Sequence, residues 1–371
     1  MAIGGMIGGG IFSVLGVTID LAGHLAFAAF LIGGVIAGLT AHAYAQLALR
    51  SGRAGGPFIY LRDEGHPRPA AWVAWLLIVG YVFALSVYAF TFGHYLANVL
   101  GAPTLFARLA GVGILALFGA INLRGVATSG RTEDIIVVTK LAVLAGVALV
   151  GVSMLSPARL SPLNNDGLLG VFLGAAVIFV AYEGFELVPY DYDDIAEPRR
   201  NVPRALYLSV VIVMVVYVAV TIASQMLISD KSIIDHKEVA FAVVGEKALG
   251  TFGLWAATVG ALFSTSSAIN ATLFSTARLT RDVSAAGELP AWLGREKGGL
   301  PVWAVLALAF AGAVFSLMPG ITEIVAFGSL TFLLVFGLIN LLHARHTSER
   351  GLDRVMAYVG AVACGAATGG L

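Results

Sequence analysis

Two carboxylic acids lie three residues apart inside an apolar part of this chain. Glu183 and Glu186 flank Gly184 in the stretch FVAYEGFELVP, which follows the uncharged run GLLGVFLGAAVI. An ionisable residue within a membrane-spanning segment is costly, and it indicates a binding site or an ion pathway rather than a lipid-facing surface. Because glycine also weakens a helix, the stretch predicts an interrupted helix with two acids beside the interruption.

A third ionisable residue, Lys140, lies within the apolar run IIVVTKLAVLAGVALVGV. On a helix it would lie about 13 Å from Arg131, at 1.5 Å per residue. We therefore expect Lys140 to face the interior of the protein and to take part in function. The alternative is that its long side chain extends to the membrane surface.

The chain begins MAIGGMIGGGIF, with five glycines among its first ten residues. Each glycine costs a helix about 1 kcal/mol relative to alanine, so this segment is also expected to be interrupted. The N–H groups freed at an interruption, together with the helix dipole, attract an anion. The alternative is close helix packing, because Gly4 with Gly8 and Gly5 with Gly9 have the spacing of small-residue packing pairs.

The composition is that of a membrane protein with little soluble mass. Of 371 residues, 58% are hydrophobic and 12% are charged, and the mean hydropathy is +0.90. The net charge of zero gives no indication of a nucleic-acid partner. The sequence has no Walker A motif, and its apolar segments contain no nucleophile–base pair, so we expect neither an ATP-driven pump nor an enzyme, and no cofactor.

The apolar runs predict an all-α polytopic membrane protein, since a span needs about 20 mostly apolar residues. We expect one transmembrane domain over 1–371, with about ten complete spans and a truncated eleventh helix at about 355–371. The expected spans cover residues 2–20, 24–48, 71–100, 103–123, 132–155, 167–190, 205–228, 248–279, 301–318 and 321–343.

The two interrupted segments are the first and the sixth of these spans. Because five is odd, the second group of five spans enters the membrane from the opposite side. The pattern predicts an inverted repeat, with one half at about 1–155 and the other at about 167–343. Interrupted segments in corresponding positions of two halves are typical of the binding site of a secondary transporter. The two kinds of free helix end suit the carboxylate and the ammonium group of an amino acid.

The basic residues are distributed unevenly between the loops. Loops after the even-numbered spans hold most of the 22 Lys and Arg residues, whereas loops after the odd-numbered spans hold Arg159, Lys231, Lys237 and Lys247. By the positive-inside rule, the N-terminus and the even-numbered loops are cytoplasmic. We expect a multi-pass protein of the plasma or inner membrane.

Several further polar residues fall within the spans. Tyr81, Tyr88 and Tyr95 recur every seven residues, and we expect them either to line a cavity or to pack against neighbouring helices. Ser264 and Thr265 offer hydroxyl groups, with hydrogen bonding to their own helix as the alternative. The seven histidines do not have the sequence spacing of metal ligands, and no metal site is expected.

Four stretches resemble the amino acid–polyamine–organocation permeases. GGMIGGGIF at 4–12 is similar to the family's G-x-x-I-G-x-G-I-F signature in its first helix. RAGGPFIYL at 53–61, AEPRRNVPRAL at 196–206 and RLTRDVSAAGELP at 278–290 resemble the loops after its second, sixth and eighth helices, although 196–206 lacks the usual Asn-Pro pair before the arginines. The family also has residues before the first motif and a twelfth helix, which this sequence does not include.

The resemblance implies the LeuT-type fold, a 5+5 inverted repeat with discontinuous helices 1 and 6, and transport by alternating access. It implies that N–H groups near Gly9 and Gly10 hold the substrate carboxylate. Backbone carbonyls of Met6, Val180 and Glu183 would hold the amino group. The substrate-binding residues expected in this way are Met6, Ile7, Gly8, Gly9, Gly10, Val180, Tyr182, Glu183 and Gly184.

The resemblance also assigns proton coupling to Lys140 and Glu186. The stretch 137–141 resembles the part of helix 5 in which proton-coupled members carry a lysine in place of a bound cation, and Ser264 and Thr265 lie at the cation-site position of helix 8. Glu186 falls where many members have an acid. The alternatives are a role for the backbone alone at Glu183 and a buried, protonated structural acid at Glu186.

The sequence therefore predicts a secondary active transporter of amino acids or related amines, coupled to protons by symport. An exchanger of the same fold is the alternative. A passive channel is less favoured, because the polar residues gather on helices 1, 5, 6 and 8 instead of forming a continuous lining. The expected partners are an amino acid or amine, protons and the lipid bilayer, and no nucleic acid.

Overall fold

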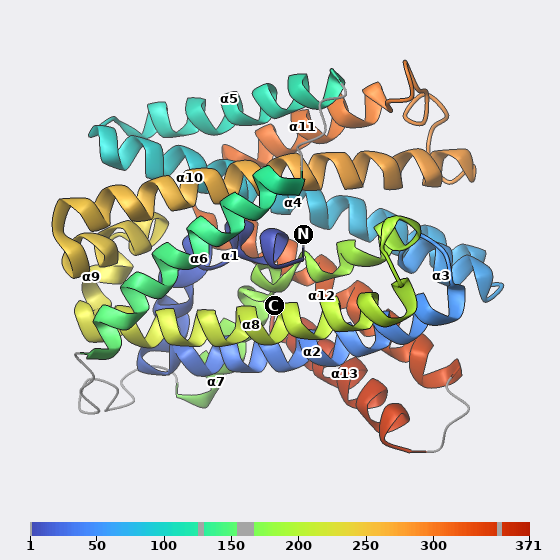
Figure 1. Ribbon diagram of the computed structural model, residues 1–371, viewed down its shortest axis with the longest axis horizontal. Coiled ribbons are helices and arrows are strands. Elements are labelled where there is room, and N and C mark those ends of the chain that lie inside the picture. Colours follow the sequence, from blue (N-terminus) through green and yellow to red (C-terminus); the bar gives the residue numbers. More distant parts are fainter. Residues whose placement is uncertain (1, 125–129, 154–166, 347–350) are drawn as a thin grey trace.

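The protein is a bundle of long helices (Figure 1). The computed structural model describes residues 2–124, 130–153, 167–346 and 351–371, which form helices and no β-strand. The α-helices are α1 (Ala2–Ala22), α2 (Ala26–Ser51), α3 (Pro57–Asp63), α4 (Pro67–Leu100), α5 (Thr104–Leu123), α6 (Gly130–Ser153), α7 (Leu168–Val177), α8 (Pro198–Leu227), α9 (Asp230–Asp235), α10 (Ala240–Ala285), α11 (Val302–Ser316), α12 (Ile321–His346) and α13 (Leu352–Gly369). Short 3-10 helices η1 (Gly23–Leu25), η3 (Phe179–Tyr182), η4 (Phe185–Asp194) and η5 (Lys237–Val239) connect some of them.

The helices have the length and composition of membrane spans. Seven helical segments of the described chain are long and apolar enough to cross a membrane, or eight if the bent pair Leu168–Val177 and Phe179–Asp194 forms one span. One of the seven, Ala2–Ser51, contains both α1 and α2, and the apolar α11 is shorter than the others, with 15 residues. The chain is thus an all-helical polytopic membrane protein, as predicted, while the count of ten spans stays a prediction.

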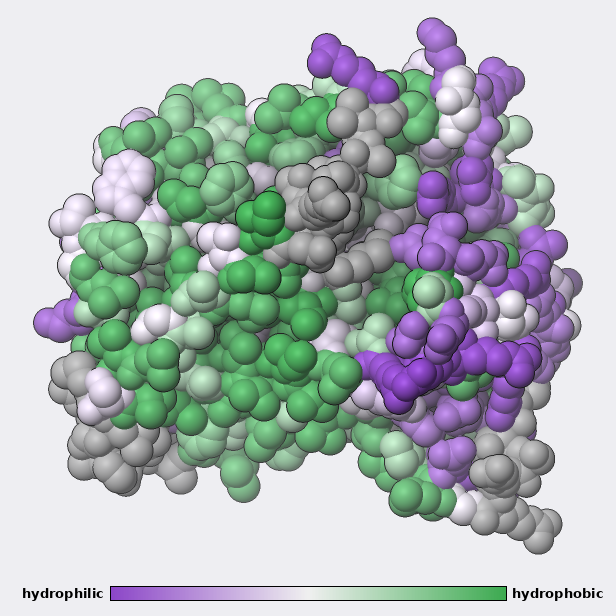
Figure 2. All heavy atoms as spheres, viewed as in Figure 1, coloured by the Kyte–Doolittle hydropathy of each residue, from purple (hydrophilic) through white to green (hydrophobic). Residues whose placement is uncertain are grey.

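The surface separates into an apolar region and a polar end. Figure 2 shows apolar side chains over most of the visible face and hydrophilic side chains gathered at one end of it. Figure 1 places α3, the start of α8 and the end of α10 at that end. These elements adjoin the loops in which the sequence concentrates its basic residues.

The predicted interruption of the sixth span is present. The helix axis bends by 55° between α7 and the 3-10 segment that follows, and Gly184, between η3 and η4, has φ 125°. Ser329 of α12 binds both sides of the bend, because its Oγ accepts the N–H of Val180 at 2.8 Å and donates to the carbonyl of Val177 at 2.5 Å. One side chain therefore satisfies two backbone groups that the surrounding apolar core would leave without partners.

The predicted interruption of the first span is wrong, because α1 runs as one α-helix from Ala2 to Ala22. Its glycines serve close packing instead. A methyl group added at Gly8 would lie 2.5 Å from Cβ of Ala268, and one added at Gly5 would lie 3.1 Å from Cα of Gly184. The N–H groups of an unbroken helix are bound within the helix, so Gly9 and Gly10 do not offer them freely in this conformation.

Two constraints require glycine at position 184, the backbone conformation and the close approach of α1. The φ of Gly184 lies in the region that disfavours side chains, and an added methyl group would lie 2.6 Å from the backbone nitrogen of Met6. We predict that Gly184→Ala destabilises the protein by about 3 kcal/mol or more, through backbone strain and overpacking. Thermal unfolding of the purified protein in detergent would measure the loss.

Gly38→Ala on α2 is the matched control, because a methyl group at Gly38 meets no atom within 4 Å. It should leave the unfolding temperature unchanged or raise it slightly, by up to about 1 kcal/mol of stability. Equal stability of the Gly184→Ala variant and the unchanged protein would contradict the close approach of α1 to the bend.

Candidate functional site

The ionisable residues singled out from the sequence lie together in the interior, around the contact of α1 with Gly184 in the interrupted sixth span. Lys140, Glu183 and Glu186 are each at most 1% exposed. Figure 1 shows α1 in the middle of the molecule, between α10 on one side and α2 and α8 on the other. Lys140 therefore faces the protein interior, and its side chain does not reach the membrane surface.

The two acids are bound by tyrosines of α4. The Tyr88 hydroxyl donates a hydrogen bond to Oε2 of Glu183. The Tyr81 hydroxyl donates to Oε1 of Glu186 at 3.3 Å, and the N–H of Gly184 donates to Oε2 of the same carboxyl group at 2.7 Å. Tyr95, the third of the tyrosines that recur every seven residues, donates a hydrogen bond to the backbone oxygen of Phe12 at 2.9 Å.

The three tyrosines thus lie on the face of α4 that contacts the predicted site. Each of the three hydroxyls contacts either α1 or the bent sixth span, which are the two segments expected to hold substrate. Of the two interpretations given from the sequence, the structure shows packing, because the three rings are buried and their hydroxyls bind polar groups of neighbouring segments. Cavity lining stays a prediction.

Lys140 and Ser264 tie α1 to its neighbours. Nζ of Lys140, on α6, donates to the carbonyl oxygen of Gly4 at 2.7 Å. Oγ of Ser264, on α10, donates to the carbonyl oxygen of Ile7 at 2.6 Å. Thr265 instead donates to the carbonyl of Ala261 in its own helix at 2.8 Å, which is the alternative given for these hydroxyls.

One of the carbonyls expected to bind an amino group, that of Met6, is close to a residue that the sequence did not single out. The Tyr217 hydroxyl, on α8, lies 2.6 Å from the carbonyl oxygen of Met6 and 3.0 Å from that of Ala181. It therefore joins α1 to the bend with a donor placed between two acceptors. Tyr217 is the one hydroxyl within the apolar run VVIVMVVYVAV, a signal of the same kind as Lys140.

The site is closed in this conformation. A methyl group added at Gly9 would lie 2.0 Å from the ring of Tyr88, and one added at Gly10 would lie 1.8 Å from the hydroxyl of Tyr217. These two tyrosines fill the space beside the glycines where the substrate carboxylate was expected. Tyr182 is also buried, and its hydroxyl donates to the carbonyl of Phe30 on α2 at 2.6 Å.

Two cavities lie away from this contact. One, of about 820 Å³, is lined by His24, Gln225, Asp230, Glu246 and Lys247 among others. The other, of about 330 Å³, is lined mainly by apolar side chains together with Ser266, Ser267 and Asn270. The hydroxyl groups of α10 therefore face different surroundings. Ser264 binds α1, whereas Ser266 and Ser267 line the second cavity.

Similarity to known proteins is extensive. Residues 1–367 match the amino acid permease family. The uncharacterized protein MJ0609 of Methanocaldococcus jannaschii is 30% identical over 92% of this chain and 80% of its own length. The methylthioribose transporter of Bacillus subtilis is 29% identical over 78% of this chain and 66% of its length.

A mammalian relative is similar over a smaller share of its length. The large neutral amino acids transporter small subunit 2 of the rat is 30% identical over 78% of this chain, and the match covers 57% of that protein. The family match spans nearly all of the helices described above, including α1, the bent sixth span and α10. The chain belongs to the amino acid permease family of the amino acid–polyamine–organocation superfamily, and its relatives in Bacillus subtilis and the rat are named as transporters.

Proposed function

We propose that this protein is a secondary active transporter of amino acids or related amines that works by alternating access and is coupled to protons by symport. The observation that carries the proposal is the contact of α1 with Gly184 in the interrupted sixth span, with Lys140, Glu183 and Glu186 buried around it. Buried ionisable groups at an interrupted helix are the usual components of a coupled transport site.

The proposed architecture is the LeuT-type 5+5 inverted repeat, with halves at about 1–155 and about 167–343. The bend in the sixth span and its contact with the first support this assignment, since these segments occupy corresponding positions in the two halves. In this fold the two halves of the repeat move relative to each other and open the site to each side in turn.

The proposed substrate site lies between Met6–Gly10 and Val180–Gly184. The carbonyls of Met6 and Ala181 both lie within 3.0 Å of the Tyr217 hydroxyl. These two carbonyl oxygens therefore face a side-chain hydrogen-bond donor in this conformation. The ammonium group of a substrate would replace that hydroxyl there. For this to happen the Tyr88 and Tyr217 rings must withdraw from Gly9 and Gly10, which makes the closed arrangement one end of a transport cycle.

Lys140 is the proposed proton-coupling group, together with Glu186. Its bond to the Gly4 carbonyl joins α6 to the first turn of α1. A hydrogen bond from an ammonium group is about twice as strong as one from a neutral donor, so the loss of a proton from Lys140 would loosen α1. That change would couple proton transfer to the opening of the site.

The names of the relatives give the range of substrates to be tested. One is named for large neutral amino acids and another for methylthioribose, a thiosugar. The alternative mechanism is exchange rather than symport. The name of the Bacillus subtilis relative adds a second alternative, transport of a small polar solute other than an amino acid.

Transport assays distinguish these functions. The purified protein in sealed proteoliposomes should take up radiolabelled amino acids against their gradient when the outside is made acidic, and a protonophore should abolish the accumulation. Uptake that requires an unlabelled amino acid inside and ignores the pH gradient would establish the exchanger. The absence of saturable uptake for amino acids and amines alike would contradict the proposed substrate class.

Lys140→Ala should abolish pH-driven accumulation and leave substrate binding measurable, since the lysine contacts α1 outside the proposed substrate site. Uptake with and without a pH gradient, and binding by thermal shift, are the two measurements. Thr139→Ala is the control, because Thr139 is the exposed neighbour of Lys140 on the same helix, and it should behave as the unchanged protein. Proton coupling that survives in Lys140→Ala would remove Lys140 from the mechanism.

Ser264→Ala should slow uptake by about fivefold, the factor that corresponds to the roughly 1 kcal/mol of one buried hydrogen bond. The bond lost is the one to Ile7, which holds α1 against α10. Thr280→Ala removes a hydroxyl of the same helix that bonds within it, to the carbonyl of Thr276, and should leave the uptake rate unchanged. Equal rates for the two variants would show that the contact of Ser264 with α1 does not affect transport.

A further inference from the structure

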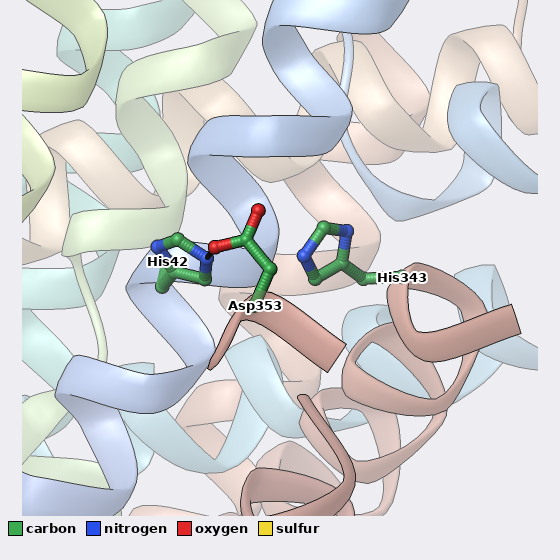
Figure 3. Close-up of side chains that lie close together, drawn as sticks. All are labelled: His42, His343 and Asp353. Atoms are coloured by element: carbon green, nitrogen blue, oxygen red, sulfur yellow. Dashed lines mark hydrogen bonds and ion pairs between the residues drawn. The ribbon is translucent and has the colours of Figure 1, made fainter. Parts of the chain in front are cut away.

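Two histidines and an aspartate from three different helices meet at one point, away from the proposed transport site. They are His42 on α2, His343 on α12 and Asp353 in the first turn of α13. One potential ligand atom from each lies within 4.8 Å of the others, and Nε2 of His42 lies 3.0 Å from Oδ1 of Asp353. Figure 3 shows the carboxyl group of Asp353 between the two imidazole rings.

The state of His343 points to a missing ligand. Its side chain is fully buried, and neither ring nitrogen has a hydrogen-bond partner among the residues that the structure describes. Buried polar groups in proteins nearly always have partners, so a fully buried imidazole with two unsatisfied nitrogens needs an explanation. A metal ion between His343, Asp353 and His42 would supply a partner for one of these nitrogens.

The surroundings of His42 have the form of a second coordination shell. Nδ1 of His42 lies 2.8 Å from the hydroxyl of Tyr207 on α8. A metal-bound histidine usually donates its other ring N–H to such a group, which fixes the orientation of the ring. Nε2 of His42 is thereby directed at Asp353 and His343.

We propose that His42, His343 and Asp353 bind a divalent transition-metal ion, with Zn²⁺ as the best fit. Two imidazoles and one carboxylate suit Zn²⁺ and its neighbours in the first transition row, whereas Ca²⁺ and Mg²⁺ require more oxygen ligands than this cluster offers. Ligands of a tetrahedral zinc ion lie about 3.3 Å apart. The three ligand atoms lie within 4.8 Å of one another, so the widest separation has to shorten by at most about 1.5 Å. Asp353 is a third exposed, which gives the ion a route of entry.

The ion would fasten α13 to α2 and α12. These are the same two helices that hold the bend of the sixth span, through the carbonyl of Phe30 on α2 and the hydroxyl of Ser329 on α12. Three ligands leave a fourth position for water, as in zinc sites that are not closed by protein. Because its ligands come from α2, α12 and α13, the proposed metal site connects three helices. It is separate from the substrate site.

The histidine spacing in the sequence could not reveal this site. His42 and Asp353 are 311 residues apart, and they meet only because α13 packs across α2 and α12. The sequence expectation of no metal site rested on spacing within single segments, and the cluster uses one residue from each of three.

The test is a metal titration of the purified full chain with its affinity tag removed, after treatment with a chelator. The unchanged protein should bind one Zn²⁺ per chain, measured by competition with a chromogenic chelator, and Co²⁺ should give the visible absorption of a four-coordinate site. Zn²⁺ should also raise its unfolding temperature. Failure of the unchanged protein to bind Zn²⁺ stoichiometrically, or Co²⁺ bound without that absorption, would overturn the proposal without any variant.

Variants then assign the ligands. His343→Gln should weaken Zn²⁺ binding by more than about 100-fold, and Tyr207→Phe by about 10-fold, as expected for a ligand and for a group that orients a ligand. His24→Gln is the matched control, because His24 also lies 3.0 Å from an aspartate, Asp230, and belongs to no such cluster among the residues that the structure describes. Zn²⁺ binding that persists in His343→Gln, or is lost equally in His24→Gln, would place the ion elsewhere.

Discussion

Backbone groups exposed inside an apolar protein must find partners, and this constraint organises the whole site. The bend between α7 and η4 frees N–H and C=O groups that hydrocarbon side chains cannot satisfy. Ser329 binds one N–H and one carbonyl at the bend, and the hydroxyl of Tyr217 donates a hydrogen bond to the carbonyl of Ala181. The interrupted span is therefore held by hydroxyls from α8 and α12, which are groups that can exchange one hydrogen-bond partner for another.

Close approach is the second requirement, and glycine provides it on both sides. Gly5 and Gly184 bring α1 and the bend into backbone contact, and Gly8 brings α1 against Ala268 of α10. Along the same helix, Lys140 and Ser264 bind the carbonyls of Gly4 and Ile7. The glycines reduce the intrinsic stability of α1 as a helix. Close packing and hydrogen bonds to neighbouring helices, which larger side chains at these positions would prevent, offset that loss.

The sequence predicted what depends on local pattern and missed what depends on packing. Hydropathy gave the helices, and the AYEGFE stretch gave the bend, because apolar length and a glycine beside two acids are local signals. The continuity of α1 was not predictable, since the same glycines suit an unwound segment and a closely packed helix. Ser329 and the cluster of His42 with His343 depend on contacts between helices far apart in the chain, which periodicity within one segment does not encode.

The partners of the ionisable residues explain how the site can change its protonation state without losing its structure. Glu183 and Glu186 accept hydrogen bonds from tyrosine hydroxyls, and a hydroxyl can donate to a carboxylate or accept from a carboxylic acid. Lys140 donates to a backbone carbonyl, which accepts from an ammonium group and from a neutral amine. These hydrogen bonds can persist in either protonation state, so the groups around α1 are suited to bind and release protons while the bundle stays folded.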